Sequence, residues 1–282
     1  MSDKVTEMSH AQAGMLLDLV LGDDGVYSDL DAKALVNLAE AAEVLGRSED
    51  AERLLSRIDV ADITSSWEGL AQARSLLDRD PKSALETMGR IVTELRSSED
   101  ELLLASGLNL LSQAQAIDEN LEAAIETQYE SLAIKRGAES LVGQANAYHN
   151  LLQFAKQLDD LDSALDHAQK IVELVREIED RGWEMNALAD LAHLFACDEQ
   201  FGKSEDNYRL SLDLAEEQDD MTASVIANWG IADIAMINGD GQLALEHYSQ
   251  ALASQIQTGQ PTPPALIQRI ESLTNRDNQQ SD

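Results

Sequence analysis

The sequence predicts an all-α protein made of repeated helical hairpins, and composition and periodicity both support this fold class. Only 4 prolines and 15 glycines interrupt 282 residues, and aromatic side chains make up 4% of them. Alanine, leucine and glutamate are abundant, which favours helices over strands. Four similar segments begin forty residues apart, at Leu108, Tyr148, Leu188 and Asn228. In each, apolar residues recur at three- and four-residue spacing around a short polar break, which predicts two helices joined by a tight turn.

The N-terminal segment, residues 1–30, is expected to contain a tail and a capping helix. Apolar residues follow helical spacing from about Ser9 to Leu21. A polar loop follows, in which Ser28 and Asp31 have the spacing of a capping box for the next helix. The apolar stretch is far shorter than a membrane span, so membrane insertion is not expected.

The repeat array is predicted to cover residues 31–259. Its two N-terminal copies are looser, with the small residues Ala51 and Ala84 thirty-three residues apart. In the four later copies, small residues mark the point where the second helix approaches the first: Ala124, Ala164, Ser204 and Ala244. The expected hairpins span residues 31–63, 64–98, 101–137, 141–179, 182–219 and 221–258.

Residues 260–274 are expected to form a C-terminal capping helix. Three prolines between positions 261 and 264 end the array, because proline cannot continue a helix. The apolar residues after them share one helical face that can cover the last hairpin: Leu266, Ile267, Ile270 and Leu273. The polar residues 275–282 are predicted to be disordered.

Two sets of residues resemble the tetratricopeptide repeat (TPR). Trp67, Leu70 and Ala71 match the aromatic, leucine and small residues that open its first helix, and Ala244, Tyr248 and Ala251 match its second helix. The forty-residue spacing resembles the variant found in cell-polarity adaptors, kinesin light chains and bacterial peptide-sensing regulators. The resemblance implies a right-handed α-α superhelix of about six TPR-like hairpins, with a capping helix at each end. It also implies that the first helices line a concave groove.

Carried over to this sequence, the resemblance places a set of mostly polar residues in that groove. They are Asn109, Gln113, Asn146, His149, Asn150, Gln153, Asn186, Asp190, His193, Trp229 and Asp233. Amide and imidazole groups at these intervals suit hydrogen bonding to an extended peptide, although an open solvated face would have the same composition. Trp229 either anchors a partner or is buried under the C-terminal helix.

No catalytic, cofactor or metal motif stands out, so neither an enzyme nor a bound cofactor is predicted. The acidic run from Asp159 lacks the glycine and terminal glutamate of a calcium loop. Cys197 follows His193 by four residues, and both are interpreted as packing or groove residues. His167 and His247 occupy the same repeat position, which predicts ordinary repeat surface. A metal pair of His149 and His193 with Asp190 is a weaker alternative.

The formal charge of −33 disfavours nucleic acids and anionic membrane surfaces as partners. The same acidity also arises from selection for solubility or from a salty cell interior. The groove positions that clamp an acidic C-terminus in chaperone-docking relatives lack basic residues here, except Lys156. A basic, neutral or apolar segment of another protein is therefore the expected partner. A single cysteine favours a reducing cytoplasm.

These features together predict a protein-protein interaction scaffold, or adaptor, that binds a peptide or helix of a partner protein in its groove. One alternative is a peptide-sensing regulator whose superhelix tightens around a small peptide. Another is a regulatory subunit of a separately encoded enzyme such as a protease. Self-association through exposed repeat faces is also possible.

Overall fold

The computed structural model describes residues 10–22, scattered positions from 35 to 77, and residues 79–98 and 100–280. The loop with Ser28 and Asp31, and most of the predicted hairpin 31–63, lie outside the described residues. The described helices are α1 (His10–Gly22), α6 (Pro81–Leu95), α7 (Glu101–Ile117), α8 (Leu121–Gly137), α9 (Leu141–Gln157), α10 (Leu161–Ile178), α11 (Arg181–Cys197), α12 (Phe201–Glu217), α13 (Met221–Ile237), α14 (Gly241–Thr258) and α15 (Pro264–Gln280). In the described part of the chain the fold is all-α, as predicted.

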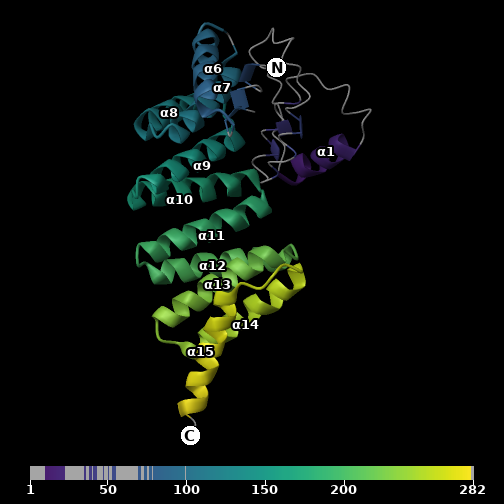
Figure 1. The fold of residues 1–282 in the computed structure, drawn as a ribbon, viewed down its shortest axis with the longest axis vertical. Coiled ribbons are helices and arrows are strands. Elements are labelled where there is room, and N and C mark those ends of the chain that lie inside the picture. The colour runs from purple at the N-terminus through teal and green to yellow at the C-terminus, as the bar shows by residue number, and fades with distance from the viewer. Residues whose placement is uncertain are drawn as a thin grey trace. The chain divides into compact units, whose positions relative to one another are not determined.

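The chain divides into two compact units. Unit 1 comprises Met1–Asp160 with Glu177–Asp180, and unit 2 comprises Leu161–Arg176 with Arg181–Asp282. In unit 1, α6 packs on α7, α7 on α8 and α8 on α9; in unit 2, α11 to α15 pack in the same sequential order (Figure 1). Each unit therefore has the neighbour-to-neighbour packing of a repeat protein.

From α7 onward, the turns that connect consecutive helices, here called links, recur every twenty residues. This is half of the forty-residue period of the sequence repeat. After α7, the Asn120 N–H donates to the Gln115 carbonyl at 2.9 Å, and the Glu119 N–H donates to the Ala116 carbonyl at 3.1 Å. These two bonds form a Schellman motif, which closes a helix through a residue in the left-handed region. Asn120 then caps α8, because its side chain accepts a hydrogen bond from the Ala123 N–H at 3.3 Å. One residue thus ends a helix and begins the next.

Residues with positive φ mark every such link. They are Glu119, Glu139, Asp159, Glu179, Glu199 and Asp219, followed by Gly239 and Gly259. The N-cap residue that follows the link accepts a hydrogen bond from its own helix at Asn120, Ser140, Asp220 and Asp240. The sequence conceals these links because most carry an acidic residue where glycine is usual. The same pair of backbone hydrogen bonds recurs at Glu139, Asp159, Glu199, Asp219 and Gly239.

A glycine at such a link is expected to stabilise the protein. Glu139 has a φ of 54°, a conformation that costs a side chain with a Cβ about 1–2 kcal/mol and that glycine adopts freely. After the entropy cost of glycine, Glu139→Gly should raise the free energy of unfolding by about 0.5–1 kcal/mol. Chemical denaturation measures this. Glu126→Gly, at an exposed position inside α8, removes the same charge and should lower stability by about 1 kcal/mol. A loss of stability in both variants would show that the left-handed backbone at Glu139 is not a source of strain.

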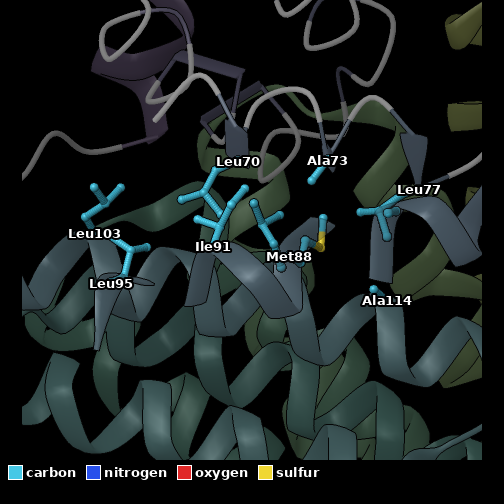
Figure 2. Packing of buried hydrophobic residues seen from close by; sticks show 10 residues of the cluster. Leu70, Ala73, Leu77, Met88, Ile91, Leu95, Leu103 and Ala114 are labelled. Carbon is cyan, nitrogen blue, oxygen red and sulfur yellow. The ribbon is translucent and has the colours of Figure 1, made fainter. Parts of the chain in front are cut away.

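Small residues let the paired helices approach closely, as the sequence pattern predicts. Ala124 on α8, Ser204 on α12 and Ala244 on α14 are fully buried, and Ala164 on α10 is 1% exposed. In unit 1, Met88, Ile91 and Leu95 of α6 pack against Leu103 and Ala114 of α7, together with Leu70, Ala73 and Leu77 (Figure 2). Burial of these apolar side chains is the main source of stability in such a stack.

The C-terminal helix α15 caps unit 2 and is longer than predicted. Leu266 and Leu273 are buried in a cluster with Tyr248 and Ala251 of α14. Ile267 is 42% exposed, since the buried positions follow a four- and three-residue spacing that leaves it beside the contact. The helix continues to Gln280, so the expected boundary at residue 274 is too early. Residues 275–280 contain neither proline nor glycine, and nothing in them stops the helix.

Candidate functional site

The predicted groove residues of unit 1 lie on α7 and α9, as expected. His149 is exposed, whereas the other members are half-buried: Asn109, Gln113, Asn146, Asn150 and Gln153. The structure brings two of them together, because the Asn150 side-chain amide donates to Asn109 Oδ1 at 2.8 Å. These two residues come from neighbouring first helices, so the α7 and α9 faces are adjacent within unit 1.

Asn109 is the centre of a polar network that the sequence did not indicate. Its Oδ1 also accepts hydrogen bonds from Gln128 Nε2 at 3.0 Å and from Lys135 Nζ at 3.5 Å. Gln128 is fully buried on α8, and its Oε1 accepts a hydrogen bond from Ser112 Oγ at 2.5 Å. A buried amide must be satisfied internally, so the network orients α7, α8 and α9 relative to one another. A ligand at Asn109 would compete with three donors.

The predicted groove residues of unit 2 lie on α11 and α13. Asn186, Asp190 and His193 are exposed on α11, whereas Trp229 and Asp233 are half-buried on α13. Their spacing of three and four residues places each set on one face of its helix. Unit 2 therefore presents its most accessible candidate side chains on α11.

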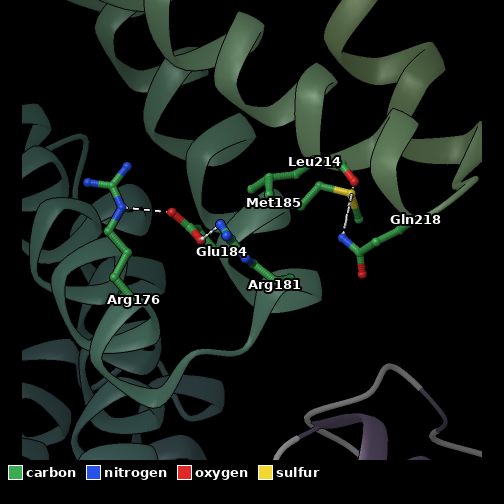
Figure 3. Close-up of polar contacts among 6 residues, drawn as sticks. All are labelled: Arg176, Arg181, Glu184, Met185, Leu214 and Gln218. Atoms are coloured by element: carbon green, nitrogen blue, oxygen red, sulfur yellow. Dashed lines mark hydrogen bonds and ion pairs between the residues drawn. The ribbon is translucent and has the colours of Figure 1, made fainter.

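The start of α11 is held in place by an ion-pair cluster. Glu184 is almost buried and accepts hydrogen bonds from Arg176 Nε at 2.7 Å and from Arg181 Nη1 at 3.3 Å (Figure 3). Its carboxylate lies in the first turn of α11, where the helix dipole also favours negative charge. Gln218 donates to the Leu214 carbonyl at 3.2 Å and approaches Met185 Sδ at 3.9 Å. These contacts position the helix turn that carries Asn186.

Tyr208 on α12 is a candidate residue that the groove prediction missed. Its side chain is 7% exposed and packs with Ala192 of α11 and Ala227 of α13. The outer edge of the ring lies against the backbone of Gly230, where an added Cβ would be 2.4 Å from Cζ. Tyr208 shares a repeat position with Tyr248, forty residues later, and this equivalence is the signal that could have revealed it.

The Tyr208 hydroxyl lies in an acidic environment. Burial and, secondarily, the acidic groups of Asp233, Cys197 and Asp190 raise the pKa of Tyr208 to about 12. The phenol therefore stays protonated at neutral pH and can both donate and accept a hydrogen bond. Asp190 and Cys197 lie on α11, and Asp233 lies on α13.

Asp233 is already engaged at the C-terminal end of unit 2. The Tyr248 hydroxyl donates to Asp233 Oδ1, and Arg269 of α15 pairs with the same oxygen at 3.3 Å. Arg269 Nη1 also donates to the Tyr248 hydroxyl at 3.2 Å, and its guanidinium lies 5.9 Å from the centre of the Tyr248 ring. Trp229 is partly buried and packs against the cluster to which Leu266 and Leu273 of α15 belong.

His167 and His247 are not the repeat surface that the sequence suggested. Both are 7% exposed, because their position on the second helix points into the stack rather than away from it. His247 Nδ1 lies 2.8 Å from Asn228 Oδ1, and the Asn228 amide donates to the Ser224 carbonyl at 3.0 Å. Since Asn228 Oδ1 can only accept, His247 carries its proton on Nδ1. Burial, assisted by the positive charge of Arg209, lowers the pKa of His247.

The lowered pKa of His247 predicts a loss of stability in mild acid. The folded protein favours the neutral imidazole. The contribution of His247 to the free energy of unfolding is therefore complete above the ordinary pKa of 6.5. It is lost as the pH falls below that value toward the folded pKa, since the unfolded chain then binds more protons. The difference in free energy of unfolding between the wild type and His247→Gln should therefore shrink from about pH 7.5 to 5.5. Parallel pH profiles of the two proteins would contradict this expectation.

Other chemistry is limited in the part of the chain that the structure describes. Cys197 is an exposed free thiol whose Sγ lies 3.8 Å from His193 Nε2. Among the described residues, no group of three or more histidine, cysteine or acidic side chains could hold a metal ion. None of the described helices is both long and apolar enough to cross a membrane.

Comparison with known proteins supports the fold. No protein-family model and no curated protein matches the chain. The apo form of RapI is similar over 88% of this chain and 72% of its own, with a TM-score of 0.76 and 12% identity. A Rap protein complexed with Competence and Sporulation Factor is also similar over 88% of this chain and 72% of its own, with a TM-score of 0.58 and 15% identity. A Pyrococcus horikoshii signal-transduction ATPase with a tetratricopeptide repeat sensor matches 97% of this chain and 42% of its own, with a TM-score of 0.66 and 16% identity.

The described helices thus have the tetratricopeptide-like repeat fold. This confirms the fold class predicted from the repeat pattern. Stacked repeats of this kind create extended surfaces.

Proposed function

We propose that this protein is a protein-interaction scaffold that binds a peptide or helix of a partner through its first helices. The observation that carries the proposal is the α11 face of unit 2, where Asn186, Asp190 and His193 are exposed in a row. Such side chains can exchange hydrogen bonds with the backbone of an extended peptide. The fold, shared with a Rap protein that was crystallised with a bound factor, supports the same role. No catalytic activity is part of the proposal.

A peptide-sensing regulator is the second candidate. The similarity to Rap proteins and to a tetratricopeptide repeat sensor favours it. In that case ligand binding would shift the relative populations of two arrangements of the stack. Small-angle scattering with and without a bound peptide separates the candidates, because an adaptor keeps its profile and a sensor changes it.

Site-specific photo-crosslinking tests the proposed surface. A photoreactive amino acid at His193 of α11 should capture a partner protein in a lysate of the native cell. The same amino acid at Asp213, an exposed position on the second helix α12, serves as the control. Crosslinks that form at His193 and not at Asp213 support the proposal. Equal capture at both positions, or none at either, would remove the case for this surface.

A further inference from the structure

The helix α13 carries almost no charge, although the chain as a whole is strongly charged. Charged residues make up 26% of the sequence, whereas Asp233 is the one charged residue among the 17 residues of α13. The carboxylate of Asp233 is already engaged, because the Tyr248 hydroxyl donates to Oδ1 and Arg269 pairs with the same oxygen. A helix that is apolar on all sides is normally buried on all sides.

Two isoleucines of α13 are nevertheless exposed. Ile226 is 50% exposed and Ile237 is 57% exposed. Their separation of eleven residues places them on the same face of the helix, about 16 Å apart along its axis. Trp229 and Asp233, which are both half-buried, lie between them along this side of α13. These four residues are here called the α13 stripe.

Packing of the repeats does not require apolar residues at these positions. Residues at the equivalent positions of earlier first helices are mostly polar or small: Ser106, Asn146 and Asn186 for Ile226; Asn109, His149 and Ala189 for Trp229; and Ile117, Gln157 and Cys197 for Ile237. The same helix pairing thus forms with polar side chains at these points. Single exposed apolar residues are common on protein surfaces, but a group of them along one helix face indicates a contact surface.

The sequence around α13 is acidic and contains no basic residue. No lysine or arginine occurs between Arg209 and Arg269, and these two arginines pair with Glu205 and Asp233. Carboxylates lie in the links at both ends of α13 and on the neighbouring helices: Asp219, Asp220 and Asp240 in the links, Asp213, Glu216 and Glu217 on α12, and Glu246 on α14. A complementary partner is therefore basic beside its apolar residues. The same charges disfavour a second copy of this acidic chain.

We propose that the α13 stripe binds an amphipathic, basic helix of the partner protein. The inference rests on the proposed function and names the chemistry of the partner. Apolar side chains of that helix would cover Ile226, Trp229 and Ile237, and lysine or arginine beside them would lie near the carboxylates of the links. A helix fits the stripe because its apolar residues at positions i, i+4, i+7 and i+11 extend over the same length of about 16 Å.

Selection of a random peptide library on the full-length chain tests the stripe. Enriched peptides should repeat apolar residues at three- and four-residue spacing, with lysine or arginine beside them. Ile226→Asn and Ile237→Gln introduce residues that earlier first helices already carry at these positions, so both variants should fold. Each should weaken the binding of an enriched peptide about tenfold in fluorescence polarisation, since one isoleucine is removed from the contact.

Three controls accompany these variants. Ile256→Gln, at a position 66% exposed on the second helix α14, should leave the affinity unchanged. Ile226→Leu keeps an apolar side chain and should retain most of the binding, which separates a lost contact from a folding defect. A proline at the centre of the peptide should abolish binding, because it breaks a helix. The affinity should also fall as the salt concentration rises.

The outcomes separate the two proposals. Affinities insensitive to Ile226→Asn and Ile237→Gln, or lowered equally by Ile256→Gln, would overturn the stripe while retaining a peptide-binding scaffold. Enriched peptides that lack basic residues or tolerate the central proline would overturn the basic helix as its occupant. A dimer in sedimentation velocity that Ile226→Asn abolishes would assign the stripe to a second copy and would also overturn the proposal. A selection that enriches no peptide would overturn the proposed function itself.

Discussion

Replacing Gly230 by alanine is expected to lower the free energy of unfolding by about 1–3 kcal/mol, the usual cost of overpacking a core. The new Cβ would lie 2.4 Å from Cε2 and Cζ of Tyr208, closer than non-bonded carbon atoms approach. Tyr208 is buried between α11 and α13 and has little room to move. The clash therefore outweighs the gain of about 1 kcal/mol that alanine normally brings to a helix interior.

The matched control is Gly89→Ala, in the interior of α6. No atom lies within 4 Å of the position where its Cβ would be added, so this change should stabilise the protein by about 1 kcal/mol. A double-mutant cycle with Tyr208→Leu tests the proposed cause, because a smaller side chain should reduce the cost of Gly230→Ala. If the cost is the same in both backgrounds, the contact with Tyr208 is not its origin. Urea denaturation followed by circular dichroism measures the four proteins of the cycle and the Gly89→Ala control.

Met88→Ala should lower the free energy of unfolding by about 2–5 kcal/mol, since it leaves a cavity in the core of unit 1. Met88 is fully buried on α6, near Leu70 and Ile91 (Figure 2), and Leu110 of α7 belongs to the same cluster. Those neighbours come from separate helical segments, and rigid helices collapse only partly around a lost side chain.

Two further variants check this expectation. Leu102→Ala removes a side chain that is 55% exposed and should change stability by no more than about 0.5 kcal/mol. Met88→Leu conserves most of the volume and should cost less than about 1.5 kcal/mol. Similar losses for Met88→Ala and Leu102→Ala would mean that the cluster is not the core of unit 1.

Parts of the site could not be predicted because the repeat pattern locates a position but not its hydrogen bonds. Asn109 and Asn150 were expected to face a ligand, and the structure shows them bonded to each other through Asn109 Oδ1. The same oxygen also accepts a hydrogen bond from Gln128, which lies on a second helix and is buried where the TPR pattern carries an aromatic residue. Tyr208 was missed for the related reason that groove residues were sought on first helices alone.

The sequence by itself determined the helical fold, the forty-residue register and the small residues at the helix contacts, because these follow from local spacing and side-chain size. It also predicted a C-terminal helix with four apolar residues on one face, of which Leu266 and Leu273 are buried and Ile267 is 42% exposed. Only the tertiary structure decided that the links repeat every twenty residues and that His247 is buried. It alone showed Tyr208 buried against Ala192 of α11 and Ala227 of α13. These features depend on contacts between side chains of separate helices. The periodicity of the sequence within one helix does not determine those contacts.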